Sequence, residues 1–351
     1  MIVCKKYTKN ILRTRQTYNT RQDKIRLGMN EYLPSMPDQL FNKIMASFTN
    51  EIASSYPEVN QAYNSLSNFL SQPRDRILIT SGADMAIRIT LDTFCSFGDE
   101  ISTISPTFAM YKIHANLLGC KLVEKKCDKK GLSTVKDLLS LVGLKTKVVI
   151  LSNPNGVTGF LFSILNLRKL IKKAEKQNTL VVIDETYVDF SGINTEQLID
   201  EFPNVVIIRS FSKNIGFAGL RIGYILTSEY LAEMIEKFKP MMEINSFAVQ
   251  AIKIVCSNKQ YLKSAVKNII TSRKNFSLGL KKLNYQTIER DGNFVLVYFG
   301  KDREKVCKLL EDNNVEYKVL PEPLSKYIRL TVGTDKVMKG VLKIISMASN
   351  Y

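Results

Sequence analysis

Residues 205–224 read VVIIRSFSKNIGFAGLRIGY, an apolar run followed by serines, a lysine and an arginine. The four β-branched residues at the start are typical of a buried strand. Polar residues follow where that strand should end, and Lys213 lies among them. A lysine partly withdrawn from water at such a place would be a good nucleophile. The stretch therefore predicts a strand that delivers a reactive amine, with Arg221 further along the same loop.

Similar apolar runs occur on both sides of this stretch. Strands are predicted at residues 76–80, 147–151, 180–183 and 220–226. Helical spacing lies between them, as in residues 165–177. Short strands that alternate with helices predict an α/β fold with a doubly wound, mostly parallel sheet covered on both faces. A ligand site is expected at the carboxyl ends of such strands.

The length of 351 residues allows one large domain and a smaller one. We expect an irregular, basic N-terminal arm that joins the small domain (1–35), a large domain (36–240) and a small α+β domain (241–351). A long helical stretch, roughly residues 230–283, should lead into the small domain. Strands are predicted there near residues 294–297 and 328–332.

The composition excludes several classes of protein. Lys and Arg number 50 against 33 Asp and Glu, a formal net charge of +17. No nucleic-acid-binding motif accompanies this excess, so a lysine-rich solvated surface, or an active site for anions, is favoured over nucleic acid as a partner. No apolar run is long enough for a membrane span, and no secretory signal is recognised. Six cysteines without a CxxC pair and a single histidine predict reduced thiols, a cytoplasmic location and no metal site.

Three other predicted strands also end in polar residues. They run into Ser81-Gly82-Ala83-Asp84, Ser152-Asn153-Pro154-Asn155-Gly156 and Asp184-Glu185-Thr186-Tyr187. The first of these turns opens a helix, and the free amide groups of a helix start suit a phosphate. Asp184 is placed where a cationic ring nitrogen would need an anion. The sequence thus gathers an amine, an anion and an anion-binding turn at one edge of the sheet.

Six segments together resemble the fold-type-I aminotransferases, in family order. They are SGADMAI (81–87), PTFAMY (106–111), SNPNGVTG (152–159), IDETYVDF (183–190), RSFSKNIGFAGLRIGY (209–224) and IRLTVGT (328–334). Within that group the chain is similar to the histidinol-phosphate aminotransferase family, over residues of about 26–335. The resemblance implies pyridoxal 5′-phosphate as cofactor, a large and a small domain of the kinds predicted above, and a homodimer with shared active sites.

The resemblance also implies a role for each matching residue. Lys213 would carry the cofactor as a Schiff base and shuttle the Cα proton, Asp184 would pair with the pyridinium nitrogen, and Tyr187 would hydrogen-bond the ring O3′. Phe108 would stack on the ring. The cofactor phosphate would be held by Gly82, Ala83, Asp84, Ser210, Ser212 and Arg221, and by Tyr56 of the partner subunit. On the substrate side the resemblance implies Asn30 and Arg329, whose planar guanidinium suits a carboxylate or phosphate.

Two positions depart from the family pattern. The family usually has Asn-Pro-Asn-Asn-Pro-Thr-Gly after the second predicted strand, whereas this chain has Gly156 and Val157 at the fourth and fifth places. Asn155 or a water molecule would then have to replace the usual O3′ contact. Lys318 stands near the place of a second arginine that binds the substrate phosphate in many members. Lysine keeps the charge there but lacks the bidentate fork.

The expected reaction transfers an amino group between a small anionic, phosphorylated amine and a 2-oxo acid, with histidinol phosphate and 2-oxoglutarate as the default pair. A decarboxylase of threonine or serine phosphate on the same scaffold is the alternative, and it would release carbon dioxide without an acceptor. A regulator with an aminotransferase-like domain would need a DNA-binding domain, for which the arm is too short. Singly, Asp184 could be a turn cap, Arg329 a surface ion pair and Tyr56 a packed aromatic, so the joint pattern carries the prediction.

Overall fold

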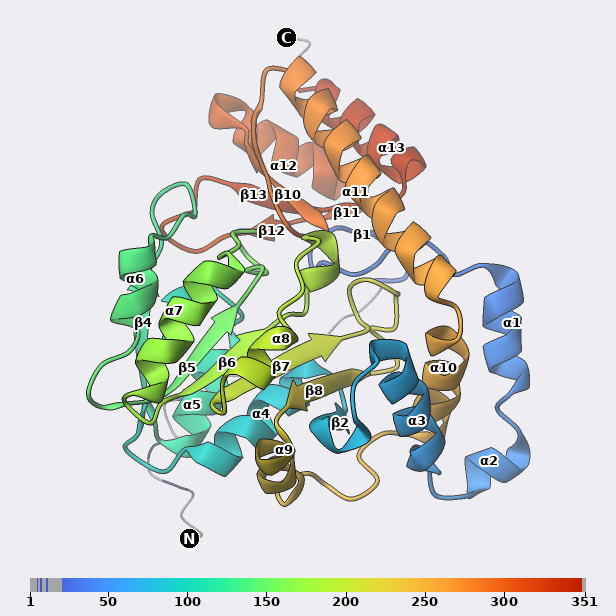
Figure 1. Cartoon of the computed structure of the whole chain (residues 1–351). Helices are drawn as coiled ribbons and strands as arrows, with labels where there is room; N and C mark the ends of the chain where they lie inside the picture. The colour runs from blue at the N-terminus through green and yellow to red at the C-terminus, as the bar shows by residue number, and fades with distance from the viewer. Residues whose placement is uncertain (1–4, 6, 8–10, 12–20, 349–351) are drawn as a thin grey trace, which may run out of the picture.

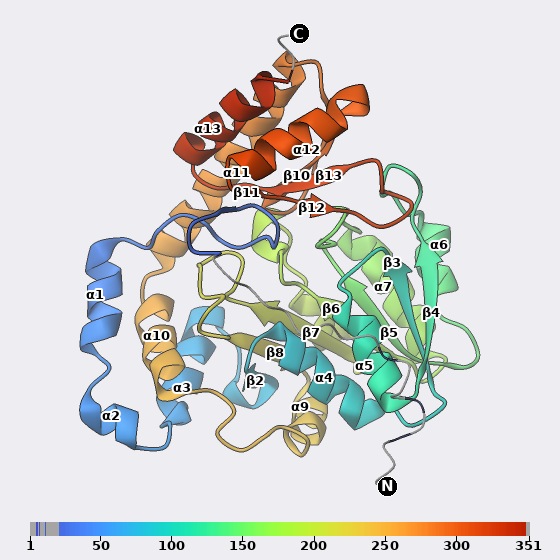
Figure 2. The same cartoon turned by 180° about the vertical axis from the view of Figure 1, so that it is seen from behind.

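The computed structural model describes residues 5, 7, 11 and 21–348. Cys4 and about half of the predicted arm lie outside the described residues. A large domain forms the lower part of the molecule in Figure 1, and a smaller domain with the C-terminal helices lies above it. Figure 2 shows the described part of the arm looping between the two domains.

A seven-stranded sheet forms the centre of the large domain. In spatial order its strands are β2 (Ile77–Thr80), β8 (Gly223–Thr227), β7 (Val205–Ser210), β6 (Leu180–Asp184), β5 (Thr146–Ser152), β3 (Glu100–Ser105) and β4 (Lys121–Lys126). Only β8 runs antiparallel to its neighbours, and the other described pairs in this sheet are parallel. The prediction of a mostly parallel sheet is therefore confirmed.

The strands of this sheet are buried on both faces. Along β5, Val148 and Ile150 belong to one apolar cluster, whereas Val149 and Leu151 belong to another, because successive side chains of a strand point to opposite faces. One face is covered by α4 (Ala83–Phe94), α5 (Met110–Leu118) and α9 (Glu229–Glu236). The other is covered by α1 (Asp38–Ala46), α3 (Val59–Leu70), α6 (Val135–Ser140), α7 (Ile164–Glu175), α8 (Gln197–Glu201) and α10 (Ser246–Cys256). Each fully buried Leu or Ile contributes about 1.5–3 kcal/mol.

The small domain is an antiparallel sheet covered by helices. Its strands are β12 (Lys318–Val319), β13 (Ile328–Thr331), β10 (Phe294–Tyr298) and β9 (Gln286–Glu289), and its helices are α11 (Lys259–Lys282), α12 (Arg303–Asp312) and α13 (Asp335–Ser346). In the arm, β1 (Ile25–Arg26) pairs in parallel with β11 (Val315–Glu316). The remaining short helices are α2 (Asn50–Ser54), η2 (Arg74–Arg76), η3 (Val188–Phe190) and η4 (Gly300–Asp302).

The two domains meet at one apolar cluster. Phe294 and Leu296 of β10 face the large domain, where Tyr187 and Phe190 pack with them. The alternate residues of the same strand, such as Val295, face the helices of the small domain. The side chains on one face of β10 therefore join the domains directly beside the residues that follow β6.

The long helical stretch predicted over residues 230–283 consists of three separate helices, α9, α10 and α11. Pro240 has no amide hydrogen to continue α9, and Met242 adopts a left-handed φ of 56°. The Asn245 side chain then caps α10 by accepting from the Ala248 N–H at 2.8 Å. Buried residues of α10 belong to the core of the large domain. The predicted start of the small domain at residue 241 thus lies before a helix that packs on the large sheet.

Two strands of the large sheet, β3 and β4, were not predicted from the sequence. β3 carries Ser102 and Thr103 in its buried middle, and β4 (KLVEKK) lies at the edge of the sheet with mostly polar side chains.

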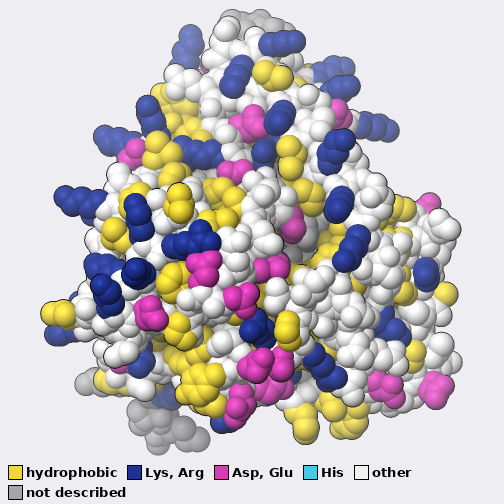
Figure 3. All heavy atoms as spheres, in the orientation of Figure 1, with side chains coloured by type: hydrophobic (Ala, Val, Ile, Leu, Met, Phe, Trp, Pro, Cys, Tyr) yellow, Lys and Arg dark blue, Asp and Glu magenta, His cyan; other side chains and the backbone are white. Residues whose placement is uncertain are grey.

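On the face shown in Figure 3, Lys and Arg side chains are spread widely and are densest over the small domain. None of the described helices combines the length and apolar character that a membrane crossing requires.

Candidate active site

Asp184 is the last residue of β6 and lies at the carboxyl end of the large sheet. Its Oδ1 accepts hydrogen bonds from the Thr186 N–H (3.0 Å) and hydroxyl (2.6 Å), and its Oδ2 accepts from the Tyr111 hydroxyl (2.6 Å). Burial raises the pKa of Asp184, whereas the bonds from Thr186 and Tyr111 and the charge of Lys213 lower it. These donors hold the carboxylate in a single orientation beside the lysine.

Phe108 lies just before α5, and Tyr111 lies in its first turn. The two rings meet edge to face, with centroids 5.8 Å apart and an interplanar angle of 86°. Tyr111 is buried, whereas Phe108 is 42% exposed and leaves part of its ring accessible to a flat ligand. Through Tyr111 the structure therefore brings two predicted residues, Phe108 and Asp184, to one place.

Lys213 lies in the loop after β7, and its Nζ donates to the Met29 carbonyl oxygen of the arm at 3.0 Å. This loop is held to the segment after β6 at two points. Arg209 donates to the Glu185 carboxylate at 2.9 Å, and the Asn214 side-chain amide donates to Asp189. An ion pair and an amide–carboxylate hydrogen bond therefore hold together the two strand ends that carry the lysine and Asp184.

The start of α4 faces Arg221. Gly82 caps this helix with a φ of +82° and without a side-chain hydrogen bond. A Cβ at Gly82 would lie 2.7 Å from Arg221 Nη2, and a Cβ at Gly223 would lie 2.5 Å from the Ala83 amide nitrogen. Two glycines thus let a guanidinium group and a strand approach the free amide groups of a helix start, which is an arrangement that binds anions.

The predicted serines lie on the same side of this anion site. Ser210 pairs with Gly223 across β7 and β8, and its hydroxyl accepts from the Ser212 N–H at 3.1 Å. Both serines are buried. The structure therefore brings together the predicted phosphate ligands at residues 82, 83, 210, 212 and 221. Asp84 belongs to the same helix turn, but its side chain pairs with His114 at 2.9 Å.

The arm supplies a second group of contacts, around Tyr187. Asn30 donates from Nδ2 to the Tyr187 hydroxyl (3.0 Å) and to the Gly156 carbonyl oxygen (3.1 Å). A Cβ at Gly156 would lie only 2.6 Å from Tyr187 Cε2 and 3.1 Å from Cζ. The ring of Tyr187 therefore fills the space that a side chain at residue 156 would need.

Arg329 completes this group from β13. Its Nη1 donates to the Gly156 carbonyl oxygen (2.8 Å) and its Nη2 to the Gly28 carbonyl oxygen (2.9 Å). The guanidinium lies over the Phe294 ring at 5.3 Å, and its buried Nε has no partner among the described residues. Burial lowers the pKa of Arg329, while the nearby Tyr187 raises it. A buried donor without an acceptor is costly unless a ligand completes it.

Three predicted residues lie apart from these groups. Asn155 uses both polar atoms of its side chain within the loop, where it donates to Pro106 and accepts from residues 157 and 158. Tyr56 lies on the outside of the large domain and is 83% exposed. Lys318 is opposite Arg329 across β12 and β13, but it lines a cavity of about 410 Å³ behind the arm.

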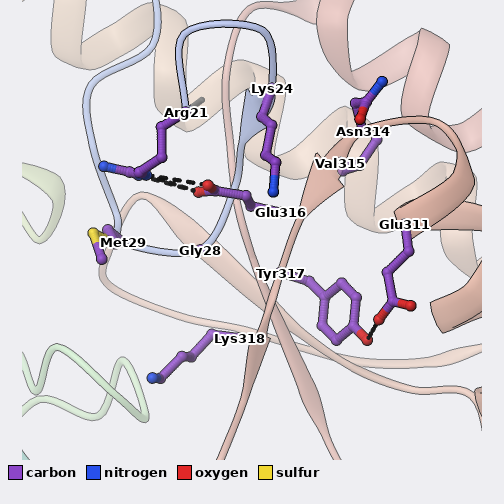
Figure 4. A pocket seen from close by; sticks show the side chains of 10 residues that line it. All are labelled: Arg21, Lys24, Gly28, Met29, Glu311, Asn314, Val315, Glu316, Tyr317 and Lys318. Carbon is purple, nitrogen blue, oxygen red and sulfur yellow. Dashed lines mark hydrogen bonds and ion pairs between the residues drawn. The ribbon is translucent and has the colours of Figure 1, made fainter. Parts of the chain in front are cut away.

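Figure 4 shows this cavity between the arm and the segment from Glu311 to Lys318. Arg21 pairs there with Glu316 at 3.1 Å and also with Glu31, and the Tyr317 hydroxyl donates to Glu311 at 2.5 Å. Within the described part of the chain neither Lys24 nor Lys318 makes an ion pair. The cavity therefore has two cations to offer to an anion.

Several residues of the site had no predicted role. Tyr111 stands three residues after Phe108, and Thr186 two residues after Asp184, which is the spacing of a side-chain-to-backbone turn. That spacing could have indicated Thr186 from the sequence. Phe294 and His114 had no such signal, because their partners lie far away in the sequence. No group of three or more His, Cys, Asp or Glu suited to a metal occurs among the described residues.

Known proteins share this sequence pattern over nearly the whole chain. The sequence model of the family described as aminotransferase class I and II matches residues 22–345. The chain belongs to this family. The resemblance predicted from the motifs, the assignment as an enzyme and the fold class are thereby confirmed. Pyridoxal 5′-phosphate is the cofactor of this aminotransferase.

Individual relatives of this aminotransferase agree with the family assignment. Histidinol-phosphate aminotransferase 1 of Carboxydothermus hydrogenoformans is 29% identical over 322 residues, which are 91% of each chain. The crystal structure of the Sinorhizobium meliloti histidinol-phosphate aminotransferase with pyridoxal 5′-phosphate superposes with a TM-score of 0.83, at 23% identity, over 93% of this chain and 90% of that one. The L-threonine-O-3-phosphate decarboxylase of Porphyromonas gingivalis superposes with a TM-score of 0.77, at 19% identity, over 92% and 98%.

The residues of this aminotransferase fit the cofactor. The glycines at 82 and 223 leave a cradle at the start of α4 that a Cβ would fill, and Arg221 lies at its edge. A phosphate matches that donor set. Asp184 offers a carboxylate, Phe108 an accessible ring and Lys213 an amine at the other end of the same sheet edge.

Gly156→Ala should destabilise the protein by about 1–3 kcal/mol, because the new methyl group would displace the Tyr187 ring. That ring is packed against Phe294 and held by Asn30, so it has little freedom to move. The free energy of unfolding is measured with denaturant, for Gly156→Ala alone and in a Tyr187→Ala background, where the cost should largely disappear. Gly219→Ala serves as the control, because no atom lies within 4 Å of its Cβ position. An undiminished cost of Gly156→Ala without the tyrosine ring would contradict the steric explanation.

Asp184→Asn should raise the melting temperature of the cofactor-free protein above that of the wild type, and this difference should grow as the pH rises. Because the pKa of Asp184 is raised, the folded chain keeps this proton above pH ~3.9, near which an unfolded aspartate ionises. The folded state then binds more protons, so the free energy of unfolding of the wild type falls as the pH rises through that interval. Asparagine does not titrate, and it can still accept from Thr186.

This gain is measured as the difference in melting temperature between variant and wild type from about pH 4 to about pH 8. The difference should widen as the pH rises and level off above the pKa of the folded state. A difference that stays constant or shrinks with rising pH would sink the idea.

Proposed function

We propose that this aminotransferase moves an amino group between a small, phosphorylated amine and a 2-oxo acid, with histidinol phosphate and 2-oxoglutarate as the first pair to test. The arm turn at residues 28–30 carries the proposal. Its carbonyl groups and its asparagine contact Lys213, Arg329 and Tyr187 within one small volume. The predicted amine, the predicted anion-binding group and the predicted ring-hydroxyl partner thus surround the same space.

Each of these side chains has a separate task in the proposal. Lys213 would hold the cofactor covalently, and its amine, once displaced by the substrate amine, would take and return the proton of the substrate Cα. Asp184 keeps the cofactor nitrogen protonated, and Tyr111 keeps Asp184 in place. The bound cofactor supplies an electron sink, which the side chains of the chain cannot provide. Tyr187 would donate to the ring oxygen of the cofactor, and Asn30 orients the tyrosine.

The substrate anion is assigned to Arg329. Its unpartnered Nε and the adjacent Nη2 form one edge of the planar group, which suits a carboxylate or a phosphate. Lys24 and Lys318 line the neighbouring cavity on the other side of Met29. They would receive a second anionic group of a longer substrate. A substrate with two anionic groups, such as 2-oxoglutarate, would use both places.

The substrate assignment is tested with purified holoenzyme. Histidinol phosphate with 2-oxoglutarate should yield glutamate, and L-histidinol without phosphate should react far more slowly. Arg329→Ala should lower kcat/KM for the phosphorylated amine by about 100-fold, because it removes a charged hydrogen-bond partner. Lys318→Ala should raise KM for 2-oxoglutarate, which carries a second carboxylate, but leave that for L-histidinol unchanged. Lys213→Ala should lose the borohydride-fixed bond to the cofactor.

Other outcomes of the same assay point elsewhere. Carbon dioxide released from threonine or serine phosphate without an acceptor would assign the chain to the decarboxylases. Gly156 is the feature that gives weight to this second reading, because the Tyr187 ring occupies the space of the side chain that the family usually has at this position. An unchanged kcat/KM for Arg329→Ala would refute the role of that residue.

We further propose a cytoplasmic location, supported by the free thiols of the described cysteines. Retention of the tagged chain in a membrane or secreted fraction would contradict it.

We also propose that the enzyme is a homodimer with shared active sites. Exposed apolar side chains surround the start of α10, among them Tyr56 (83%) and Met241 (88%). Phe48 packs on Phe247 of α10 with ring centroids 5.2 Å apart. The loop before α10 touches the cofactor side, since Glu243 accepts from the Ser81 N–H at 2.5 Å. A second copy on this surface would therefore lie next to the anion site at the start of α4.

Met241→Lys should convert the dimer to a monomer, because it places a charge in the proposed apolar interface. Light scattering coupled to size-exclusion chromatography measures the mass. Leu144→Lys, at a residue that is 93% exposed elsewhere on the large domain, should leave the dimer intact. A monomeric wild type, or a dimeric Met241→Lys, would reject this interface.

A further inference from the structure

His114 is the single histidine of the chain, and it lies on α5. Its side chain is buried, at 5% exposure, and Nε2 lies 2.9 Å from Asp84 Oδ1. An ionised carboxylate can only accept, so Nε2 is the donor of this bond. One turn earlier on the same helix, Tyr111 donates to Asp184. α5 therefore holds two aspartates, one at each end of the candidate cofactor site.

Asp84 occupies the first turn of α4, where an acidic side chain is favoured by the free amide groups and the positive end of the helix dipole. Gly82 caps the helix without a side chain, so Asp84 carries the only carboxylate within the first turn of this helix. A free Asp84 side chain could fold back onto its own helix start. The bond to His114 holds it against α5 instead.

The hydrogen bond between His114 and Asp84 matters for anion binding, because Asp84 is negatively charged. A phosphate at the start of α4 needs the amide groups at residues 83 and 84 and the guanidinium of Arg221. A carboxylate on the same turn competes for the amide groups and repels the phosphate. Glu243 already brings a second carboxylate to the Ser81 N–H nearby. The position of the Asp84 carboxylate therefore affects how tightly the anion site can bind.

We propose that His114 is a positioning residue for the cofactor phosphate. It holds the Asp84 carboxylate on the α5 side and thereby leaves the first amide groups of α4 to the phosphate. This inference rests on the proposed placement of the cofactor phosphate at the start of α4. His114 itself contacts neither the cofactor nor the substrate in this scheme, and it acts through Asp84 alone.

The test is a double-mutant cycle on the full chain, with His114→Phe, Asp84→Asn and the double variant, and with His114→Gln as the conservative replacement. The dissociation constants of pyridoxal 5′-phosphate and of inorganic phosphate are measured on cofactor-free protein. The ³¹P NMR shift of the bound cofactor reports on the phosphate environment. His114→Phe should weaken both ligands about 5- to 10-fold, because the freed carboxylate competes at the helix start. His114→Gln keeps an N–H donor and should remain close to the wild type.

Asp84→Asn in the His114→Phe background should restore binding, since a neutral amide neither repels the phosphate nor competes as an acceptor with full charge. If the histidine were purely structural, His114→Phe would lower the melting temperature by the same amount with and without Asp84→Asn and leave the ³¹P shift unchanged. That result, or a double variant that binds as weakly as His114→Phe, would overturn the inference. If His114→Phe does not fold, Asp84→Asn alone decides, because it should bind phosphate at least as tightly as the wild type.

A separate variant tests the placement on which the inference rests. Arg221→Ala should weaken inorganic phosphate regardless of the residue at 114. If Arg221→Ala binds phosphate as the wild type does, the proposed anion site is wrong. If Arg221→Ala weakens binding and His114→Phe does not, the anion site stands and only the role of His114 fails.

Discussion

Two carbonyl groups of the arm, those of Gly28 and Met29, receive the side chains of Arg329 and Lys213. The rest of the site depends on where this turn lies. The small domain fixes the turn, because the Thr331 hydroxyl donates to the Leu27 carbonyl and accepts from the Asn30 N–H. Lys213, in contrast, belongs to the large domain. The arm is therefore the element through which the position of one domain is transmitted to the chemistry of the other.

Much of the large domain could be predicted from the sequence, because buried parallel strands require continuous apolar runs and end in polar residues. Lys213, Asp184 and the helix start at Gly82 were found in this way, and the structure places them at one edge of the sheet. Their individual roles stay predictions. β4 was missed because an edge strand needs few apolar side chains. The break between α9 and α10 depends on a left-handed residue, Met242, that carries no glycine signal.

The sequence showed that residue 156 lacks a side chain, but it could not show what fills the space. Tyr187 fills it, and the two residues are 31 positions apart in the chain, so no local pattern connects them. Lys318 illustrates the opposite case. Its register opposite Arg329 suggests a shared site, yet its side chain lines the cavity behind the arm. Side-chain direction at a strand end depends on the neighbouring loop as well as on register.

Polar groups of the site differ in how completely they are satisfied. Arg209 is paired with both Glu185 and Glu196, so the charges that fasten the lysine loop are compensated within the protein. Arg329 Nε and one oxygen of Glu243 are buried without a partner among the described residues. Leaving such groups unsatisfied costs stability, and proteins tolerate that cost mainly where function requires it. Arg209, whose charge is compensated, thus belongs to the scaffold of the site, whereas Arg329 and Glu243, which keep unpartnered atoms, belong to its binding surface.

The pairing of β1 with β11 sets the order in which the molecule can assemble. Asn30 and Thr331, which hold the arm turn in place, are 301 residues apart in the sequence. A ribosome must therefore have made residues up to 331 before the arm turn meets its partners in the small domain. The strands from β2 to β8 contain all the contacts of the large sheet and can pair earlier. Domains made first generally fold first. The arm turn can therefore reach its final position beside the reactive lysine only after β13 of the small domain has been made.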